Sequence, residues 1–354
     1  MKVGFIGLPQ SGKSTLFAAI TGEQPDPYAQ PAPRHSVVKV PDGRLDYLTE
    51  LHHPKKVIEA TIEFVDMPGV SMDGDKGQEE WRRLLPVIRQ MDLLVAVVRD
   101  FEDPSVAAYR DRIDPKADFE AVWDELIFAD LDAVTTRIER IRSALKKPTK
   151  THENEQRELS LLERCLAALE SAVPLSEVIS TDEDRKAVSS FAFLTERPIV
   201  CVRNVGDDRA DESAGIDVAH VKASLTLCAS IEAEIAALDE ADRGPFLADL
   251  GLEQPARDRL IRACYRACGL ISFLTVGSDE VRAWTIRAGD TAAVAAGKIH
   301  TDLQRGFIRA ETVAYDDLVA HTDMKGARAA GKVRKEGKTY VVADGDILNI
   351  LAST

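Results

Sequence analysis

A glycine-rich motif near the start of the chain constrains the fold more than any other feature of the sequence. Residues 7–15 read GLPQSGKST, a full match to the pattern G-x-x-x-x-G-K-[ST]. The motif lies between a strand-like run at 2–6 and the apolar start of a helix at 16–20. Its glycines let backbone N–H groups turn inward around a phosphate, and the following helix adds its dipole. A chance glycine-rich turn would not need these flanking elements, so we predict a phosphate-binding P-loop.

The P-loop assigns a role to several side chains. We expect Lys13 to reach the β- and γ-phosphates of a nucleotide and the Ser14 hydroxyl to bind Mg²⁺. The whole motif is predicted to contact the nucleotide, through residues Gly7, Leu8, Pro9, Gln10, Ser11, Gly12, Lys13, Ser14 and Thr15.

A second motif, Asp66-Met-Pro-Gly69, follows a strand-like run that ends at Val65. A D-x-x-G pattern is weak alone, but here it comes at the end of a strand and about fifty residues after the P-loop. A phosphoryl-transfer site needs a second carboxylate on its Mg²⁺ side. We therefore expect Asp66 to hold the metal through water and the Gly69 N–H to contact the γ-phosphate. Lys13 and Gly69 are the predicted catalytic residues, and Ser14 and Asp66 the predicted metal ligands.

Three further strand-like runs, at 93–98, 198–202 and 223–228, complete a nucleotide-binding pattern. The second leads into Asn204-Val-Gly-Asp207, where side chains that read the base are expected, and the third ends in a loop of small residues. Together these runs predict an α/β fold with a doubly wound parallel sheet and ligand loops at the strand ends. The predicted base-binding residues are Asn204, Val205, Asp207, Cys228, Ala229 and Ser230.

About 95 residues separate the strands at 93–98 and 198–202, far more than one helix needs. Within this interval, apolar residues repeat at spacings of three and four on both sides of a polar turn at 146–152. The pattern predicts an inserted antiparallel helical hairpin, resembling a coiled coil, which either supports packing or docks a partner.

From residue 271 onward the sequence changes to short strand-like runs, at 271–276, 280–286, 338–342 and 347–351. They predict a separate small α+β domain. This domain carries a basic run that favours either a solvated face or a contact with RNA or the ribosome, formed by Lys325, Arg328, Lys332, Arg334, Lys335 and Lys338.

Charge and cysteine content limit the environment of the protein. The 45 Lys and Arg residues against 59 Asp and Glu give a net charge of −14, which argues against coating nucleic acid and against a specific DNA partner. No apolar run approaches the length of a transmembrane helix, and no leader segment precedes the first motif, so we expect a cytoplasmic protein without a membrane partner. The five cysteines suit reduced, buried thiols; a metal site or redox pair at Cys264 and Cys268 is the weaker alternative.

With these motifs in place, nearly the whole chain resembles the YchF-type Obg-like P-loop NTPases of the translation-factor class. The resemblance implies a G domain at 1–117 and 197–270, an inserted helical domain at 118–196, and at 271–354 a TGS domain, a ubiquitin-like module. It also implies an ATPase or GTPase that binds the ribosome, with Mg²⁺ as cofactor and a monomeric chain. The resemblance rests on GLPQSGKSTLF at the start, VPDGRLDYL at 40–48, EFVDMPGV at 63–70, FLTERPIVCVRN at 193–204, CASIEAEIAALDE at 228–240, EVRAWTI at 280–286, KIHTDLQRGFIRAE at 298–311 and DGDILNI at 344–350.

Several positions depart from the family pattern. Gln10 replaces an Asn that is associated with monovalent-cation dependence. No Thr occurs between Gly22 and Leu48 to join the Mg²⁺ shell, and Gln30 lies nearest the expected place. Ala108 and Tyr109 precede Ile113-Asp-Pro, where relatives have a catalytic His, so no water-positioning residue is evident; His35 is the weak substitute. These losses predict slow hydrolysis.

The base preference stays open between ATP and GTP. Guanine readers use N-K-x-D, in which the carboxylate accepts from the N1 and N2 groups of guanine, whereas YchF relatives typically have N-x-x-E and favour ATP. The sequence Asn204-Val-Gly-Asp207 keeps the Asp but lacks the Lys. We expect a preference for ATP by family, with weak discrimination. The leading hypothesis is a slow ATP- or GTP-hydrolysing switch at the ribosome in translation or stress response; the alternative is a nucleotide-gated binding module with little or no hydrolysis.

Overall fold

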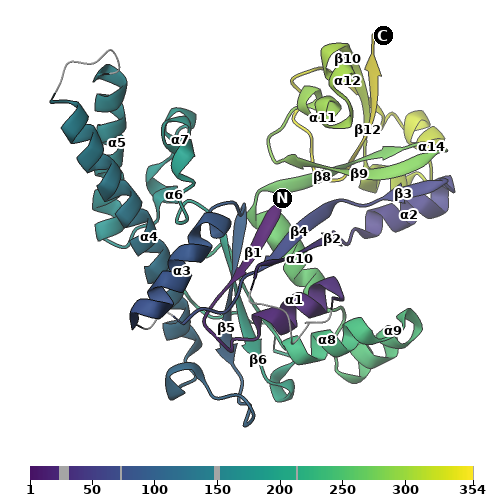
Figure 1. The fold of residues 1–354 in the computed structure, drawn as a ribbon. Coiled ribbons are helices and arrows are strands. Elements are labelled where there is room, and N and C mark those ends of the chain that lie inside the picture. The colour runs from purple at the N-terminus through teal and green to yellow at the C-terminus, as the bar shows by residue number, and fades with distance from the viewer. Residues whose placement is uncertain (24–31, 72–73, 147–151, 213, 354) are drawn as a thin grey trace. The chain divides into compact units, whose positions relative to one another are not determined.

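The computed structural model of the chain describes residues 1–23, 32–71, 74–146, 152–212 and 214–353. The chain divides into two compact units (Figure 1). The first unit contains Met1–Val37 and Glu63–Leu260, and the second contains Val38–Ile62 and Ile261–Thr354.

The first unit is built on a six-stranded sheet with the order β2-β4-β1-β5-β6-β7. Strand β1 pairs in parallel with both β4 and β5, and parallel pairing continues through β6 to β7. Strands β4 and β5 lie on opposite sides of β1, so the strand order reverses at β1. The loop after β1 therefore lies at the switch point where such sheets bind ligands. The strands are β1 (Lys2–Ile6), β2 (Arg34–Lys39), β4 (Thr61–Asp66), β5 (Leu93–Asp100), β6 (Ile199–Val205) and β7 (Ala223–Leu227).

Helices account for most of the remaining chain of this unit. They are α1 (Lys13–Thr21), α3 (Gly74–Ile88), α4 (Pro115–Ala144), α5 (His152–Glu170), α6 (Leu175–Val178), α7 (Asp182–Val188), α8 (Ala229–Ala237), α9 (Glu240–Asp249) and α10 (Ala256–Ala267), with short 3₁₀ turns at Tyr109–Asp111, Ser189–Phe191 and Asp207–Arg209. The division between the units falls within α10. Seven consecutive residues of β5 are buried, which explains its unbroken apolar sequence, since a parallel sheet is covered on both faces. The doubly wound parallel sheet predicted from the sequence is confirmed.

The inserted segment forms the predicted helical hairpin from α4 and α5, which lie side by side (Figure 1). Ile138 and Ile141 of α4 are buried in the same core cluster as Leu162 and Cys165 of α5. This core continues without a break into residues of β5 and β6, so the base of the hairpin shares the core of the nucleotide-binding sheet. The domain limits predicted for the insertion, 118–196, stay a prediction.

A buried ion pair fixes the base of the hairpin. Asp130 of α4 is 0% exposed and accepts hydrogen bonds from the Leu194 and Thr195 backbone N–H groups and from the Thr195 hydroxyl. Arg89, just after α3, donates to the same carboxylate at 2.9 Å. A buried carboxylate is tolerated only when its charge and lone pairs are satisfied, and here four bonds do so.

The second unit contains a mixed sheet with the order β11-β10-β12-β8-β9-β3. Strands β8 and β9 form an antiparallel pair, and β3 adds to β9 in parallel. The elements are α2 (Gly43–His52), β3 (Lys56–Ile58), β8 (Leu270–Val276), β9 (Glu280–Arg287), α11 (Ala292–Ile299), α12 (Thr301–Arg305), β10 (Phe307–Ala314), α13 (Tyr315–Ala320), α14 (Met324–Ala329), β11 (Arg334–Glu336) and β12 (Asp346–Ala352).

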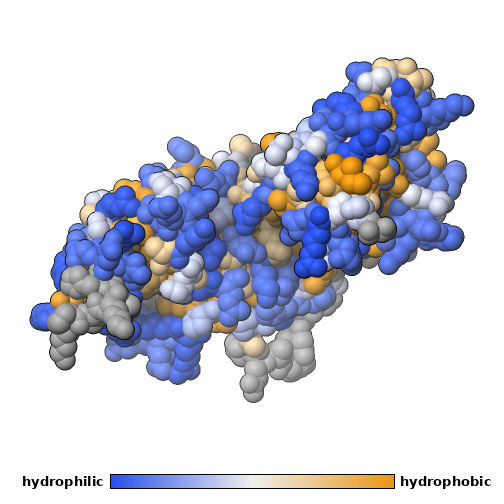
Figure 2. Space-filling view, turned by 90° about the horizontal axis from the view of Figure 1, so that it is seen from above, coloured by the Kyte–Doolittle hydropathy of each residue, from blue (hydrophilic) through white to orange (hydrophobic). Residues whose placement is uncertain are grey.

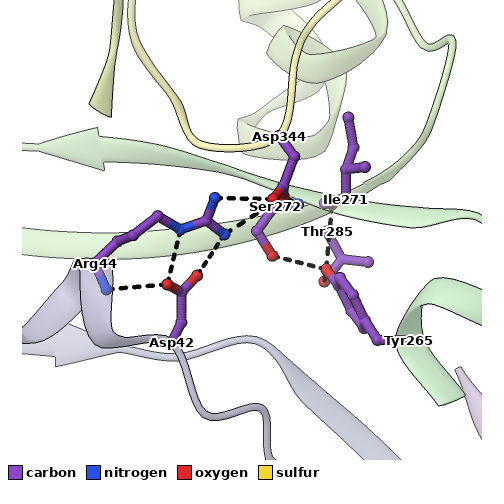
Figure 3. A network of polar contacts seen from close by, with 7 residues as sticks. All are labelled: Asp42, Arg44, Tyr265, Ile271, Ser272, Thr285 and Asp344. Atoms are coloured by element: carbon purple, nitrogen blue, oxygen red, sulfur yellow. Dashed lines mark hydrogen bonds and ion pairs between the residues drawn. The ribbon is translucent and has the colours of Figure 1, made fainter. Parts of the chain in front are cut away.

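A polar network joins the start of α2 to the C-terminal strands of this unit (Figure 3). Arg44 donates to Asp42 at 2.8 and 2.7 Å and to Asp344 at 2.9 Å. Asp344 also accepts from the Ser272 N–H at 2.8 Å, and the Ser272 hydroxyl lies 2.9 Å from the Tyr265 hydroxyl. Residues 38–62, which the sequence assigns to the G domain, are therefore grouped by their contacts with the C-terminal segment.

The strand predicted at 338–342 is wrong. Only Val341 forms an isolated bridge there, with Thr291, because the backbone of this segment bonds to the 290–292 turn instead of joining the sheet. The Ala292 N–H donates to the Tyr340 carbonyl, and the Val342 N–H donates to the Asp290 carbonyl. The sheet instead contains β10 and β11, which were not predicted from the sequence.

The face of the molecule in Figure 2 is mostly hydrophilic, and its apolar residues form smaller separate areas. Among the helices that the structure describes, none combines the length and apolar character needed to cross a bilayer.

Replacing Asp130 by Ala should lower the free energy of unfolding by about 3–5 kcal/mol, because Arg89 and three buried donors lose their acceptor. Chemical denaturation monitored by circular dichroism would measure this loss. The control is Glu163→Ala, which breaks an exposed pair with Arg142 and should cost less than about 1 kcal/mol. Equal effects of the two substitutions would contradict the assignment of Asp130 as a buried anchor.

Candidate functional site

The P-loop connects β1 to α1 through a backbone that requires glycine at two positions. Gly7 and Gly12 have φ values of 146° and 88°, in the range that side chains disfavour. A Cβ at Gly7 would collide with the Val97 carbonyl, and one at Gly12 with the Asn204 amide. The loop is therefore packed against the neighbouring strands β5 and β6.

Lys13 opens α1 and is almost completely buried, with 4% exposure. Its ammonium group donates to the Leu8 carbonyl at 2.9 Å. Burial lowers the pKa of Lys13 to about 8, although the nearby Asp66 carboxylate acts to raise it. Such a desolvated ammonium group gains strongly from an anion placed in the loop.

Asp66 ends β4 and is also nearly buried, with 4% exposure. One carboxylate oxygen, Oδ2, accepts from Arg34 Nη2 at 2.6 Å. The other, Oδ1, is buried and has no hydrogen-bond partner among the described residues. Gly69 follows in the D-x-x-G motif and lies against the P-loop, since a Cβ there would be 3.2 Å from Lys13 Nζ. The structure thus brings Lys13, Asp66 and Gly69 together.

The donor set at this corner fits Mg²⁺. Magnesium is usually held by one or two carboxylates or hydroxyls together with phosphate oxygens and water, so it does not need a protein cage. Asp66 Oδ1 is a buried oxygen with no described partner, and Ser14 is exposed in the first turn of α1. Within the described ranges, no three His, Cys, Asp or Glu side chains cluster as they would to hold a metal by themselves.

His35, the weak substitute for a water-positioning residue, is not brought to this corner. His35 Nδ1 pairs with Glu63 at 2.9 Å, and Glu63 lies beside Lys2, at the end of the strands away from the P-loop. Tyr109 lies within 3.3 Å of the Ser71 hydroxyl, two residues after Gly69. Gln30, the residue nearest the expected place of the missing Mg²⁺-shell Thr, lies outside the described residues.

Asn204, at the end of β6, connects the phosphate and base ends of the site. Its amide Nδ2 donates to the Ser11 carbonyl of the P-loop at 3.0 Å. Its Oδ1 accepts from the Ala229 N–H, the first residue of α8, at 2.9 Å. Both groups of this one buried side chain are therefore used to hold the two loops together.

Asp207 is held by the small-residue loop at the end of β7. The Ser230 hydroxyl donates to Asp207 Oδ1 at 2.7 Å, and the Cys228 thiol donates to the same oxygen at 3.0 Å. These bonds lower the pKa of Asp207, with that from Cys228 contributing most, and keep the carboxylate ionised. An ionised carboxylate accepts hydrogen bonds but cannot donate them.

A cavity of about 880 Å³ lies between these loops. Eight residues predicted to bind nucleotide line it: Gln10, Gly12, Thr15, Asn204, Val205, Asp207, Ala229 and Ser230. Sequence reasoning missed the end of β5 and the segment after it. Their residues Asp100, Phe101, Glu102, Asp103, Pro104 and Val106 also line the cavity, together with Ile113, Gly206, Asp208 and Arg209. The signal was available, because the carboxyl end of the predicted strand at 93–98 must share the edge of the sheet with the P-loop.

Two other features from the sequence lie outside this cavity. In the basic run of the second unit, Arg328 pairs with Glu311 at 3.3 Å and Lys332 with Asp317 at 2.9 Å, which reduces the charge available to a partner. Cys264 is fully buried, and burial raises the pKa of its thiol far above the usual range, so the redox alternative has no support here.

The fold and the site define a P-loop nucleotide-binding protein, and comparisons with known proteins narrow this class. Residues 2–154 match a family described as 50S ribosome-binding GTPase, and residues 270–353 match the YchF GTPase C-terminal family, described as a protein of unknown function. The chain is 41% identical over 362 residues to the ribosome-binding ATPase YchF of Bacillus subtilis, covering 99% of this chain and 98% of that one.

Two further relatives agree with this match. The ribosome-binding ATPase YchF of Escherichia coli O157:H7 is 39% identical over 360 residues, with 99% and 98% coverage. The solved structure of the Schizosaccharomyces pombe YchF GTPase matches with a TM-score of 0.82 and 27% identity, covering 99% of this chain and 97% of that one. The chain belongs to the YchF family, as the sequence resemblance predicted.

Replacing Asn204 by Ala should weaken binding of ATP or GTP by about tenfold or more, because each unsatisfied buried partner costs about 1–3 kcal/mol. Titration of a fluorescent nucleotide would measure the change. Asn349→Ala, at an exposed position of β12, is the matched control and should bind like the unmodified chain. Unchanged affinity in Asn204→Ala would contradict its role in joining the two loops.

Proposed function

We propose that this protein is a ribosome-associated P-loop NTPase that hydrolyses ATP, and to a lesser degree GTP, slowly with Mg²⁺. It would act as a nucleotide-dependent switch in translation or stress response, as a monomer in the cytoplasm. The observation that carries the proposal is the meeting of buried Lys13 with Asp66 and Gly69 beside the P-loop. The names of the bacterial relatives, ribosome-binding ATPases, support both the chemistry and the partner.

The proposed chemistry is positioning and charge neutralisation. Phosphoryl transfer needs little covalent participation by the protein, because the transition state is stabilised mainly by preorganised positive charges and N–H donors. In our proposal the N–H groups of residues 7–15 surround the phosphates and Lys13 neutralises their developing charge. Ser14 and Asp66 would hold Mg²⁺, which supplies further charge neutralisation when bound, and the Gly69 N–H would contact the γ-phosphate.

The base end of the cavity supports weak discrimination between ATP and GTP. In the proposal, Asn204, Val205 and Asp207 contact the base from one side, and residues 228–230 close over it from the other. Asp207 is held as an acceptor, which suits the N–H groups of guanine, while the bacterial relatives are named ATPases. ATP remains the preferred substrate in our proposal for two reasons. YchF relatives favour ATP, and this chain lacks the Lys of the guanine-binding motif N-K-x-D.

Slow turnover follows from residues that the site lacks. Val70 stands where Ras-like enzymes carry a Gln, and Ala108 and Tyr109 precede Ile113-Asp-Pro, where relatives have a His shortly before that motif. The second candidate function, a nucleotide-gated binding module with little hydrolysis, is favoured by the same substitutions. Binding to the ribosome could complete the site by ordering the attacking water.

Replacing Lys13 by Ala should reduce phosphate release from ATP by at least about a hundredfold, because one of the main transition-state charges is removed. A phosphate-release assay under multiple turnover would measure it, with Lys186→Ala, at an exposed position of α7, as the control that keeps its rate. Hydrolysis that survives in Lys13→Ala would rule out the P-loop as the reaction site.

Purified ribosomes should raise the rate of phosphate release by the unmodified chain, and the chain should sediment with ribosomes in a manner that depends on nucleotide and salt. Sedimentation and phosphate release would be measured with ATP, with GTP and without nucleotide. Nucleotide-dependent sedimentation without any turnover would favour the binding module over the enzyme. Equal sedimentation with ribosomes in the presence and absence of nucleotide would contradict the proposed switch function.

A further inference from the structure

Arg34 is a charged residue at the phosphate end of the site that no motif marks. It opens β2, and its Nη2 lies 2.6 Å from Asp66 Oδ2. The Arg34 side chain is 29% exposed and that of Asp66 only 5%, so the ion pair extends from the protein interior towards solvent. The Asp66 carboxylate is the one to which we assign Mg²⁺.

A second contact holds the Arg34 guanidinium in place. It lies over the Phe17 ring of α1, 4.9 Å from the ring centre. Phe17 is 0% exposed, so its position is fixed by the core, and the ring provides a surface that attracts a cation. Arg34 is thus held between α1 and β4, whereas a typical surface arginine moves freely in solvent.

The charges around Asp66 explain why an arginine is stable there. A nearly buried carboxyl group needs polar partners, and a hydrogen bond from a cationic donor is a strong one. Lys13 acts on the same carboxylate through space, but its ammonium group is bonded to the Leu8 carbonyl. Arg34 is therefore the direct partner of Asp66 in this structure.

We propose that Arg34 competes with Mg²⁺ for Asp66, so that nucleotide binding by this protein depends less on Mg²⁺ than it would without this arginine. The inference rests on the proposed nucleotide-binding function. A guanidinium and a divalent cation on the same carboxylate repel each other, and that carboxylate has only one negative charge to share. Arg34 must give up Asp66, or Mg²⁺ must bind with the repulsion in place. In both cases the gain in nucleotide affinity that Mg²⁺ provides is reduced.

The sequence offers few other side chains for the Mg²⁺ shell near the P-loop. No Thr occurs between Gly22 and Leu48 to add a hydroxyl to the metal shell, so Asp66 and Ser14 are the protein groups that we assign to Mg²⁺. When Arg34 engages one of the two protein groups that we assign to Mg²⁺, the effect on metal affinity is large. Arg34 is a positioning residue in this view, because it acts on the metal through Asp66.

The test measures nucleotide affinity with and without Mg²⁺ on the full chain. An ATP analogue with a fluorescent N-methylanthraniloyl group is titrated in saturating Mg²⁺ and in EDTA, and the ratio of the two dissociation constants gives the gain due to the metal. In Arg34→Gln this ratio should rise by about tenfold or more over the unmodified chain. Metal-free ATP is more negatively charged than its Mg²⁺ complex, so the loss of a nearby cation raises this ratio by itself. A variant that keeps the positive charge at position 34 separates this effect from competition for Asp66.

Two variants control the experiment. Lys39→Gln removes an exposed cation of the same strand that pairs with Glu59, and its ratio should equal that of the unmodified chain. Arg34→Lys keeps the charge but lacks the planar group over Phe17, and its ratio should rise by about threefold. If Arg34→Gln does not fold, as judged by circular dichroism, Arg34→Lys alone decides the matter.

The outcomes separate the two proposals. An unchanged or smaller ratio in the Arg34 variants, with normal binding by the unmodified chain, overturns the competition and leaves the proposed function intact. Failure of the unmodified chain to bind the analogue in both solutions overturns the proposed function and this inference with it. A larger ratio confined to the Arg34 variants supports the competition.

Discussion

The phosphate end of this protein depends on a carboxylate that is nearly out of solvent and has cations on two sides. Asp66 lies at the end of a buried strand, where it accepts a hydrogen bond from Arg34 and lies near enough to Lys13 to act on it through space. Each cation is itself anchored, Lys13 by the Leu8 carbonyl and Arg34 by the Phe17 ring. The geometry of the P-loop, the end of β4 and the start of β2 is therefore fixed by charge as well as by backbone hydrogen bonds.

The sheet order places the phosphate end and the base end of the site next to each other. Because β1 lies between β4 and β5, the loops after β1, β4, β5 and β6 share one edge, and ligand-binding side chains far apart in sequence meet there. Asn204 connects the two ends through its bonds to the Ser11 carbonyl and the Ala229 N–H. A residue that reads as part of a base-recognition motif is thus also a structural support of the P-loop.

Much of this arrangement was predictable from the sequence, and the exceptions have physical reasons. The strands around GLPQSGKST and before Asp66 have apolar runs that a parallel sheet requires, so the sheet and the main site residues followed from the pattern. The role of Arg34 was not predictable, because its partner is 32 positions away and no spacing rule links them. The strand predicted at 338–342 was wrong because alternating residues there bond to the 290–292 turn, which a local pattern cannot indicate.

The pairing of β3 with β9 shows that the C-terminal family region, residues 270–353, is smaller than the compact unit that contains it. A polypeptide restricted to residues 270–353 would contain the region that the family match covers. It would leave the edge of β9 without β3 and Asp344 without Arg44. An open strand edge of this kind promotes association between chains. An isolated protein that reproduces this unit needs residues 38–62 joined to the C-terminal segment. The unit is therefore compact in space but discontinuous in sequence.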